Sequence, residues 1–173
     1  MIQIRKNVFE TNSSSSHSLV VSKKKRGYDY ILPINENGVL IIPFGEFGWG
    51  PNILDTPFQK LCYLVTDRHG ITDEIKQLIK SKCPYVKDIQ VSAEYGSGYI
   101  DHQSVGTTNG VDDVEQLIFN KGILILIDND NNCYFSSYDV EQLFDQPKEQ
   151  LIEEVKKKSE EEWERIIRSL WNK

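Results

Sequence analysis

The polar segment Glu10–Ser18 has the residue types best suited to chemistry in this chain. Its sequence, ETNSSSSHS, places four consecutive serines directly before His17. Hydroxyls and backbone amides of such a turn can bind phosphate oxygens, and a histidine can act as an acid or a base near neutral pH. The alternative is a solvated loop whose serines bond their own backbone. The candidate catalytic residue is His17, and the candidate ligand-binding residues are Asn12, Ser13, Ser14, Ser15 and Ser16.

A second candidate segment is GYIDHQS, residues 98–104. In a strand, Asp101 and His102 would point to opposite faces, so either could pair with a residue from elsewhere. If His102 lay beside His17, a carboxylate as third ligand would complete a site suited to zinc, iron or manganese. The alternative is a polar surface loop, and the sequence leaves metal binding and any cofactor open. Asp101 and His102 join the candidate catalytic residues, and Gln103 and Ser104 the ligand-binding ones.

Two further motifs have weaker signals. In FGEFGWGP, the aromatic ring of Trp49 could stack on a base, and Glu46 could act as an acid. Packing at the end of the core explains the aromatic residues equally well, and Glu46 could instead be a surface charge. The run DNDNN, which begins at Asp128, starts like a calcium loop, but Cys133 replaces the required glycine and Asp139 the bidentate glutamate. We therefore interpret DNDNN as a turn after a buried strand, where a carboxylate can still serve a site.

Strands must position most of these motifs. Apolar and β-branched patterns predict a hairpin of Tyr28–Leu32 with Val39–Ile42, joined by a turn that ends in Asn-Gly. We expect Cys133–Ser136 to pair with the last predicted strand as its hairpin partner. The other predicted strands are Met1–Phe9, His17–Ser22, Asp88–Ser92 and Gly122–Ile127.

Helices are predicted where apolar residues recur at intervals of three and four. One helix begins at Asp55 or Thr56 with Pro57 in its first turn and ends at Gly70. A second follows Thr72 and continues to Cys83. The remaining two are a short helix at Val111–Asn120 and a long amphipathic helix from about Pro147 to Trp171.

These elements predict a single α+β domain over residues 1–173. We expect a mixed or antiparallel sheet, several short helices and the long C-terminal amphipathic helix. The simpler arrangement packs that helix across the sheet, and the alternative is that it dimerises. Neither an internal repeat nor a linker divides the chain.

Composition narrows the function classes. The chain has 173 residues, 39% hydrophobic, with a formal net charge of −6. This excess of acidic residues argues against general binding to DNA or RNA. No apolar run has the length of a membrane helix, no signal peptide is recognisable, and three widely spaced cysteines indicate reduced thiols, so we expect a cytoplasmic protein without membrane contact. Phosphate-loop, dinucleotide, hydrolase-elbow and zinc-protease signatures are absent.

Three segments together resemble a family of uncharacterised proteins from bacteriophages and Firmicutes-type mobile elements. They are RKNVFETNSSSSHSLVV, GEFGW followed by KLCYL, and GYIDHQS. The resemblance covers about residues 1–105 and implies a phage or prophage setting, which in the host would be the cell cytoplasm. It also implies that the polar motifs mark one site, and it supplies no fold, activity or cofactor.

We favour an accessory protein that binds and inhibits a host or defence factor, for example a CRISPR nuclease. An acidic protein can occupy a nucleic-acid groove on its target by matching its positive potential. The acidic candidates are Asp112, Asp113, Glu115 and the run Glu153–Glu164. The alternative is an enzyme or ligand-binding protein that acts on a phosphate-containing nucleotide or nucleic-acid end through the Ser/His/Asp residues above, with or without a metal.

Overall fold

The computed structural model describes residues 2–5, 18–23, 27–48, 50–93, 98–100, 113–127, 145–154 and 156–157. For the first two ranges it describes the backbone alone. Helices and strands are both present, and the sheets contain parallel and antiparallel pairs. The α+β class is therefore confirmed, whereas the single domain over residues 1–173 stays a prediction.

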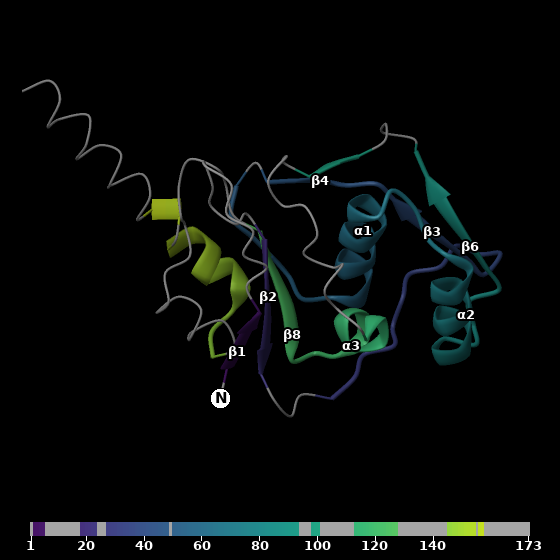
Figure 1. Ribbon diagram of the computed structural model, residues 1–173, viewed down its shortest axis with the longest axis horizontal. Helices are drawn as coiled ribbons and strands as arrows, with labels where there is room; N and C mark the ends of the chain where they lie inside the picture. The colour runs from purple at the N-terminus through teal and green to yellow at the C-terminus, as the bar shows by residue number, and fades with distance from the viewer. Residues whose placement is uncertain are drawn as a thin grey trace, which may run out of the picture.

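Four strands form an antiparallel sheet in the order β1-β2-β8-β5 (Figure 1). β8 is central: β2 pairs with it from Ile123 to Ile127, and β5 pairs with it on the other side. The side chains from Leu124 to Ile127 are buried, which explains why this strand is apolar without alternation. The strand bounds are Ile2–Arg5 for β1, Ser18–Lys23 for β2, Asn52–Leu54 for β5 and Ile123–Ile127 for β8.

Two smaller sheets each contain one parallel pair. β3 (Val39–Pro43) pairs with β6 (Asp88–Ser92), and β4 (Glu46–Phe47) pairs with β7 (Tyr99–Ile100). Two helices lie along the chain between β3 and β6, as the long crossover between parallel strands requires. The predicted strand at Asp88–Ser92 is confirmed at both ends.

Helix α1 spans Pro57–Asp67 and lies between the four-stranded sheet and the β3–β6 pair (Figure 1). Its start is as predicted, because Thr56 and Gln59 form a reciprocal capping box and Pro57 takes the first helical position. All side chains from Leu61 to Thr66 are buried. The helix is therefore enclosed by the rest of the fold instead of covering one face of it.

Helix α2 spans Asp73–Lys82, and helix α3 spans Val114–Phe119. Thr72 and Asp113 are their N-caps, and each side chain accepts a hydrogen bond from a backbone N–H in the first turn. The prediction for α2 is confirmed. α3 lies within its predicted range but begins three residues later, after its capping aspartate.

The end of α1 differs slightly from the prediction. The helix ends at Asp67, and His69 has a φ of 54°, the left-handed conformation. The N–H of Gly70 donates to Val65 O at 2.8 Å, and that of His69 donates to Thr66 O at 3.3 Å, as in a Schellman motif. His69 therefore closes the helix, with Gly70 one position beyond it.

The predicted hairpin of Tyr28–Leu32 with Val39–Ile42 is wrong. Its turn does form, because the Asn35 side chain accepts two backbone hydrogen bonds and Gly38 has a φ of 79°. The strand after the turn pairs with β6 instead, and Tyr28 forms an antiparallel bridge with Asn120 at the end of α3. Partners distant in sequence thus replace the local one.

Helical residues 148–154 and 156–157 lie where the long C-terminal helix is predicted. In Figure 1 they lie on the side of the four-stranded sheet away from α1. Leu151 is buried, and Lys148 forms an ion pair of 2.6 Å with Asp55, just after β5. Helical backbone is therefore present at the beginning of the predicted range, and the long helix itself stays a prediction. The rest of the predicted range to Trp171 lies outside the described residues, as does the predicted strand Cys133–Ser136.

Candidate functional site

Three strand ends meet at one end of the four-stranded sheet. Ser18, the first residue of β2, pairs with Ile127, the last residue of β8. Asn52, the first residue of β5, pairs with Ile127 from the other side. We call this end of the sheet, defined by Ser18, Asn52 and Ile127, the motif end.

The motif end joins three of the four polar motifs along the chain. Ser18 directly follows His17, Ile127 directly precedes Asp128, and Asn52 follows the FGWGP sequence by one bond. The strand register therefore gives a structural reason to group motifs that are more than 100 residues apart. Their own polar residues lie outside the described residues, except those in FGEFGWGP considered next.

The fourth motif is attached to the same region by β4 and β7. Glu46 pairs with Tyr99, and Phe47 pairs with Ile100, in a parallel register. The described parts of the GEFGW and GYIDHQS motifs, β4 and β7, thus lie side by side. β4 precedes Asn52 by only a few residues along the chain. The pairing of β7 with β4 therefore links GYIDHQS to the segment that leads into the motif end.

Helix α1 holds this short strand pair in place. The Gly45 N–H donates to Thr66 Oγ1 at 2.9 Å, and Thr66 Oγ1 donates to Cys62 O at 2.8 Å. The Tyr99 N–H donates to Gly45 O at 2.9 Å. The Phe47 ring packs edge-on against the buried Tyr63 ring, with 5.0 Å between their centroids.

Two glycines allow the close approach of these segments. A Cβ added at Gly98, which has a φ of +67°, would lie 2.6 Å from Phe44 Cβ and 2.9 Å from Gly45 O. A Cβ added at Gly45 would lie 2.6 Å from the Phe47 ring. All three distances are shorter than ordinary Cβ contacts, so a side chain at Gly98 would require the neighbouring backbone to shift, and one at Gly45 would require the Phe47 ring to move. The glycines of these motifs are therefore needed for the positioning of β4 and β7.

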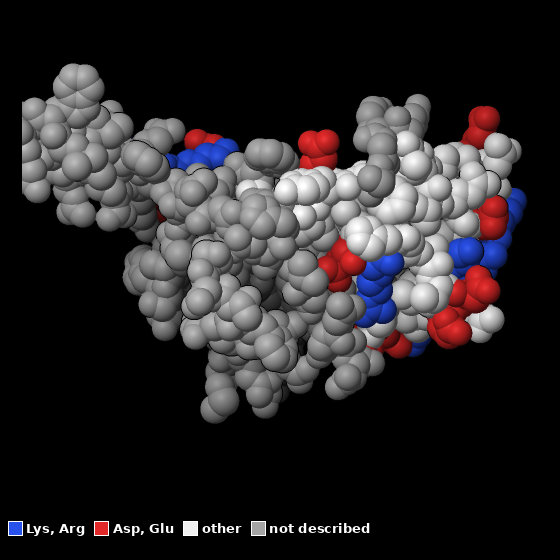
Figure 2. All heavy atoms as spheres, turned by 45° about the horizontal axis from the view of Figure 1, so that its top comes forward, with Lys and Arg blue, Asp and Glu red and all other residues white. Residues whose placement is uncertain are grey.

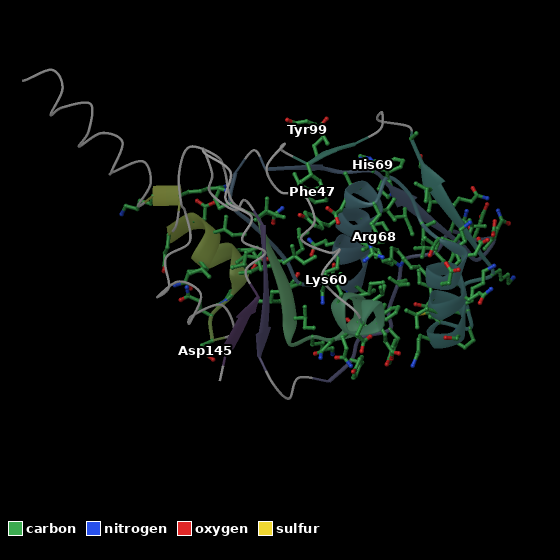
Figure 3. The ribbon with its side chains drawn as sticks, in the orientation of Figure 1. Phe47, Lys60, Arg68, His69, Tyr99 and Asp145 are labelled. Atoms are coloured by element: carbon green, nitrogen blue, oxygen red, sulfur yellow. The ribbon has the colours of Figure 1, made fainter. Side chains whose placement is uncertain are left out.

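Side chains of the β4–β7 pair divide between core and solvent. Glu46 is exposed, and Tyr99 is 42% exposed. In Figure 3, Tyr99 lies at the margin of the molecule, whereas Phe47 lies nearer α1. The pair therefore presents a carboxylate and a phenol to solvent on a strand pair fixed to the core.

Among the residues predicted to form the site, the structure describes only Glu46. The structure places Glu46 on β4 beside Tyr99 of β7, and its predicted role as an acid stays a prediction. The remaining predicted residues lie outside the described residues: Asn12, Ser13, Ser14, Ser15, Ser16, His17, Trp49, Asp101, His102, Gln103 and Ser104.

The described residues contain no group of three His, Cys, Asp or Glu side chains that could hold a metal. A site built from His17 and His102 would lie outside them. Cys62 and Cys83 are buried free thiols, and burial raises the pKa of Cys62 to about 11. A buried thiol with a raised pKa is a poor nucleophile and metal ligand, so these two cysteines are part of the core.

A polar cluster absent from the sequence prediction joins three segments. The Glu115 carboxylate accepts hydrogen bonds from Lys82 Nζ at 2.7 Å and from the Tyr30 hydroxyl at 3.1 Å. The bond from Lys82 lowers the pKa of Glu115, and Glu115 raises the pKa of Lys82. Burial, then Glu115, raises the pKa of Tyr30. Each group thus keeps its usual charge state at neutral pH. The cluster links α2 and α3 to the segment around Tyr30, which precedes β3.

Two acidic residues considered for docking make internal contacts. Asp113 caps α3, and Glu115 pairs with Lys82. Figure 2 shows acidic and basic side chains next to one another at the end of the molecule that carries α2 and β6. On this face, the described acidic residues therefore form part of a mixed surface. Asp112 and most of the run Glu153–Glu164 lie outside the described residues.

Lys60 is a buried cation that the sequence did not single out. It is fully buried on α1, and its Nζ donates to Asn120 O at 2.9 Å and to Ile123 O at 2.8 Å. Figure 3 shows it between α1, α3 and β8. Burial lowers its pKa to about 8, against the opposing effect of Asp55 and Asp29. The lysine therefore fastens α1 to the turn that leads into the central strand.

Four large side chains in the segment before β3, or in contact with it, are exposed to solvent. Ile31 is 78% exposed, and Tyr28, Ile34 and Tyr85 are each about 40% exposed. The Tyr85 hydroxyl accepts a hydrogen bond from the Leu32 N–H at 2.6 Å, which fixes the segment. We call Tyr28, Ile31, Ile34 and Tyr85 the tyrosine–isoleucine surface.

Comparisons of the chain with protein-family models, curated proteins and solved structures give no significant match. The resemblance to phage and mobile-element proteins therefore stays a prediction from the three sequence motifs. Among the described helices, none is both long and apolar enough to cross a bilayer.

Proposed function

We propose that this chain binds a phosphate-bearing ligand, a nucleotide or a nucleic-acid end, at the motif end of the sheet. One observation carries the proposal: Ser18 and Asn52 flank Ile127 in the sheet, so the strand ends next to three polar motifs lie side by side. The β4–β7 pair adds the fourth. Functional residues are commonly supplied by loops at the ends of rigid strands, which is the arrangement these registers favour.

The motifs supply complementary chemistry for such a ligand. Hydroxyls and amides of residues 12–16 suit phosphate oxygens, and the ring of Trp49 suits stacking on a base. His17 and His102 would hold or move a proton at the phosphate, with Asp101 orienting one of them. A catalytic step or a bound metal would depend on the same histidines, so both are tested by the same substitutions.

Ligand binding should depend on two of the three histidines. We expect His17→Ala and His102→Ala to weaken binding of ATP or a 5′-phosphorylated oligonucleotide about tenfold or more, since each removes a charged hydrogen bond to the ligand. Isothermal titration calorimetry measures the change. His69→Asn is the matched control, because asparagine also tolerates the left-handed conformation. Equal affinity of all three variants, or no binding of either probe by the wild type, would reject the proposal.

A second candidate function is inhibition of a host or defence factor, for example a CRISPR nuclease. The tyrosine–isoleucine surface favours it, because exposed tyrosines and aliphatic side chains on a fixed segment are typical of protein-binding surfaces. The paired state of Glu115 makes this surface a better docking candidate than the acidic residues around α3.

Inhibition should depend on Ile31. We expect expression of the chain to restore plaque formation by a phage that the nuclease targets, and Ile31→Glu to abolish that rescue, because a buried charge at the centre of an interface opposes docking. Ile41→Glu is the control, since Ile41 is 44% exposed on β3, outside the segment of Ile31. Rescue by the Ile31 variant equal to wild type, or no rescue by wild type, counts against this function.

A further inference from the structure

One edge of β6 has backbone groups without a strand neighbour. The Phe44 N–H donates to Ser92 O at 3.3 Å, which shows that Ser92 directs its backbone groups towards β3. Alternate residues of a strand face the same neighbour, so Gln90 faces β3 as well. The N–H and C=O groups of Ile89 and Val91 therefore point to the opposite edge, where the described residues include no paired strand.

The two outer edges of the β3–β6 pair differ. On β3, Val39 exchanges hydrogen bonds of 3.0 Å with Asn35, and Pro43 has no N–H to offer. On β6, residues 88–92 contain neither a proline nor a bulge. Figure 1 shows β6 at the margin of the molecule. Among the described residues, the edge of β6 therefore has neither a proline, a bulge nor a covering strand, and its one charged residue is Asp88, whose carboxylate interacts with the Ile89 N–H.

The pair is also small for an independent sheet. Its inner face packs on helices through buried residues such as Leu40, Ile42 and Ile89, while Ile41 on the outer face is 44% exposed. Parallel strands occur mainly in larger sheets, and two strands alone are marginally stable. Additional strands would therefore complete this sheet.

We propose that β6 pairs antiparallel with β6 of a second copy of this chain, about a two-fold axis at Gln90. In that register Ile89 lies opposite Val91 of the partner subunit, and the outward N–H and C=O groups of both residues bond to each other. The Ile89 N–H, which interacts with the Asp88 carboxylate within the chain, would donate to the partner strand instead. Gln90 lies opposite Gln90 of the partner subunit in a non-hydrogen-bonded pair. The result is a continuous four-stranded sheet across an isologous dimer.

Charge complementarity favours a second copy as the occupant. In this register Asp88 lies opposite Ser92 of the partner subunit, so no like charges are directly opposed. Lys80 Nζ lies 4.0 Å from Asp88, which offsets the only charge of the strand. Because β6 offers apolar residues opposite apolar residues and amide opposite amide, the strand is complementary to itself.

The purified full chain should therefore dimerise, and Gln90→Glu should weaken the dimer. The substitution places two carboxylates opposite each other across the axis and near both Asp88 residues, so we expect the dissociation constant to rise about tenfold. Sedimentation equilibrium measures it. Gln77→Glu is the control, because Gln77 is exposed on α2 and gains the same charge away from the strand. A monomeric wild type, or equal dissociation constants for the two variants, overturns the proposal.

Hydrogen exchange on the wild type tests the same edge without a substitution. Raising the protein concentration should increase protection of the Ile89 and Val91 amides. The amide of Ile41, which faces the other edge of the pair, should not change. A dimer in which the Ile89 and Val91 amides exchange at the same rate at all concentrations would place the contact elsewhere and overturn the assignment to β6.

Discussion

Lys60→Ala should lower the free energy of unfolding by about 2 to 3 kcal/mol at pH 7. The substitution removes a fully buried methylene stem, which leaves a cavity beside α1. It also removes the donor to two carbonyl oxygens, those of Asn120 and Ile123. Relief from burying a charge offsets part of this loss. Urea denaturation followed by circular dichroism measures the change.

The pH dependence separates the charge of Lys60 from its packing. Burial lowers its pKa to about 8, whereas an unfolded chain gives about 10.4. Between these values the unfolded chain holds more protons than the folded one, so the contribution of Lys60 to stability rises with pH. Lys60→Met keeps the packing and has no titrating group. The stability of the wild type relative to Lys60→Met should therefore rise by about 3 kcal/mol across this window.

Lys121→Met is the control for this experiment. Lys121 is exposed in the same turn that receives the Lys60 hydrogen bonds. We expect its stability curve to stay parallel to that of the wild type. A Lys60→Met curve that is also parallel between pH 8 and pH 10 would show that the ammonium is not desolvated by the fold. If Lys60→Ala lowered the free energy of unfolding by less than about 1 kcal/mol, the hydrogen bonds of Lys60 to Asn120 and Ile123 would not stabilise the packing of α1.

Local signals explain the parts of the fold that the sequence predicts well. Thr56 and Thr72 cap helices because their hydroxyls reach backbone N–H groups a few residues away. The β8 strand is recognisable because its apolar residues are continuous and bounded by turn residues. In each case the residues that decide the structure are neighbours in the chain.

Strand pairing was harder to predict because the partners are distant. Val39–Pro43 has the pattern of a hairpin strand and a suitable turn before it, yet β6 takes the place of the expected partner. β4 and β7 each contain two residues, too few for any periodicity. They pair where α1 holds β4 through Thr66 and Tyr63 and also contacts β7, and that helix is a separate element of sequence.

Polar residues posed a different difficulty. Lys60 looks like an ordinary helix residue, and only the carbonyl groups brought by α3 and β8 show its role. In the sequence Glu115 looks like a surface charge, and only the fold shows that it pairs with Lys82 of α2. The motif residues, in contrast, stand out by type and spacing. The sequence does not show that these motifs belong together. The pairing of Ser18 and Asn52 with Ile127 shows that the strands next to three of them end side by side.

Gly98→Ala should detach β7 from β4 while the rest of the fold remains. A methyl group at this position would meet Phe44 Cβ at 2.6 Å, Gly45 O at 2.9 Å and Thr66 Cγ2 at 3.1 Å. None of these atoms is the end of a flexible side chain, and alanine at a φ of +67° adds strain of about 1 kcal/mol. Because the pair has only two residues in each strand, moving it is easier than moving α1.

Amide hydrogen exchange measures this detachment at Tyr99. Its N–H donates to Gly45 O in the wild type, and we expect at least about tenfold faster exchange in Gly98→Ala, with core amides of α1 unchanged. Gly27→Ala is the matched control, because a Cβ there meets nothing within 4 Å. If the four motifs form one site, Gly98→Ala should weaken ligand binding as His102→Ala does. Detachment with unchanged affinity would separate GYIDHQS from the site, whereas unchanged Tyr99 exchange would show that Gly98 does not position β7.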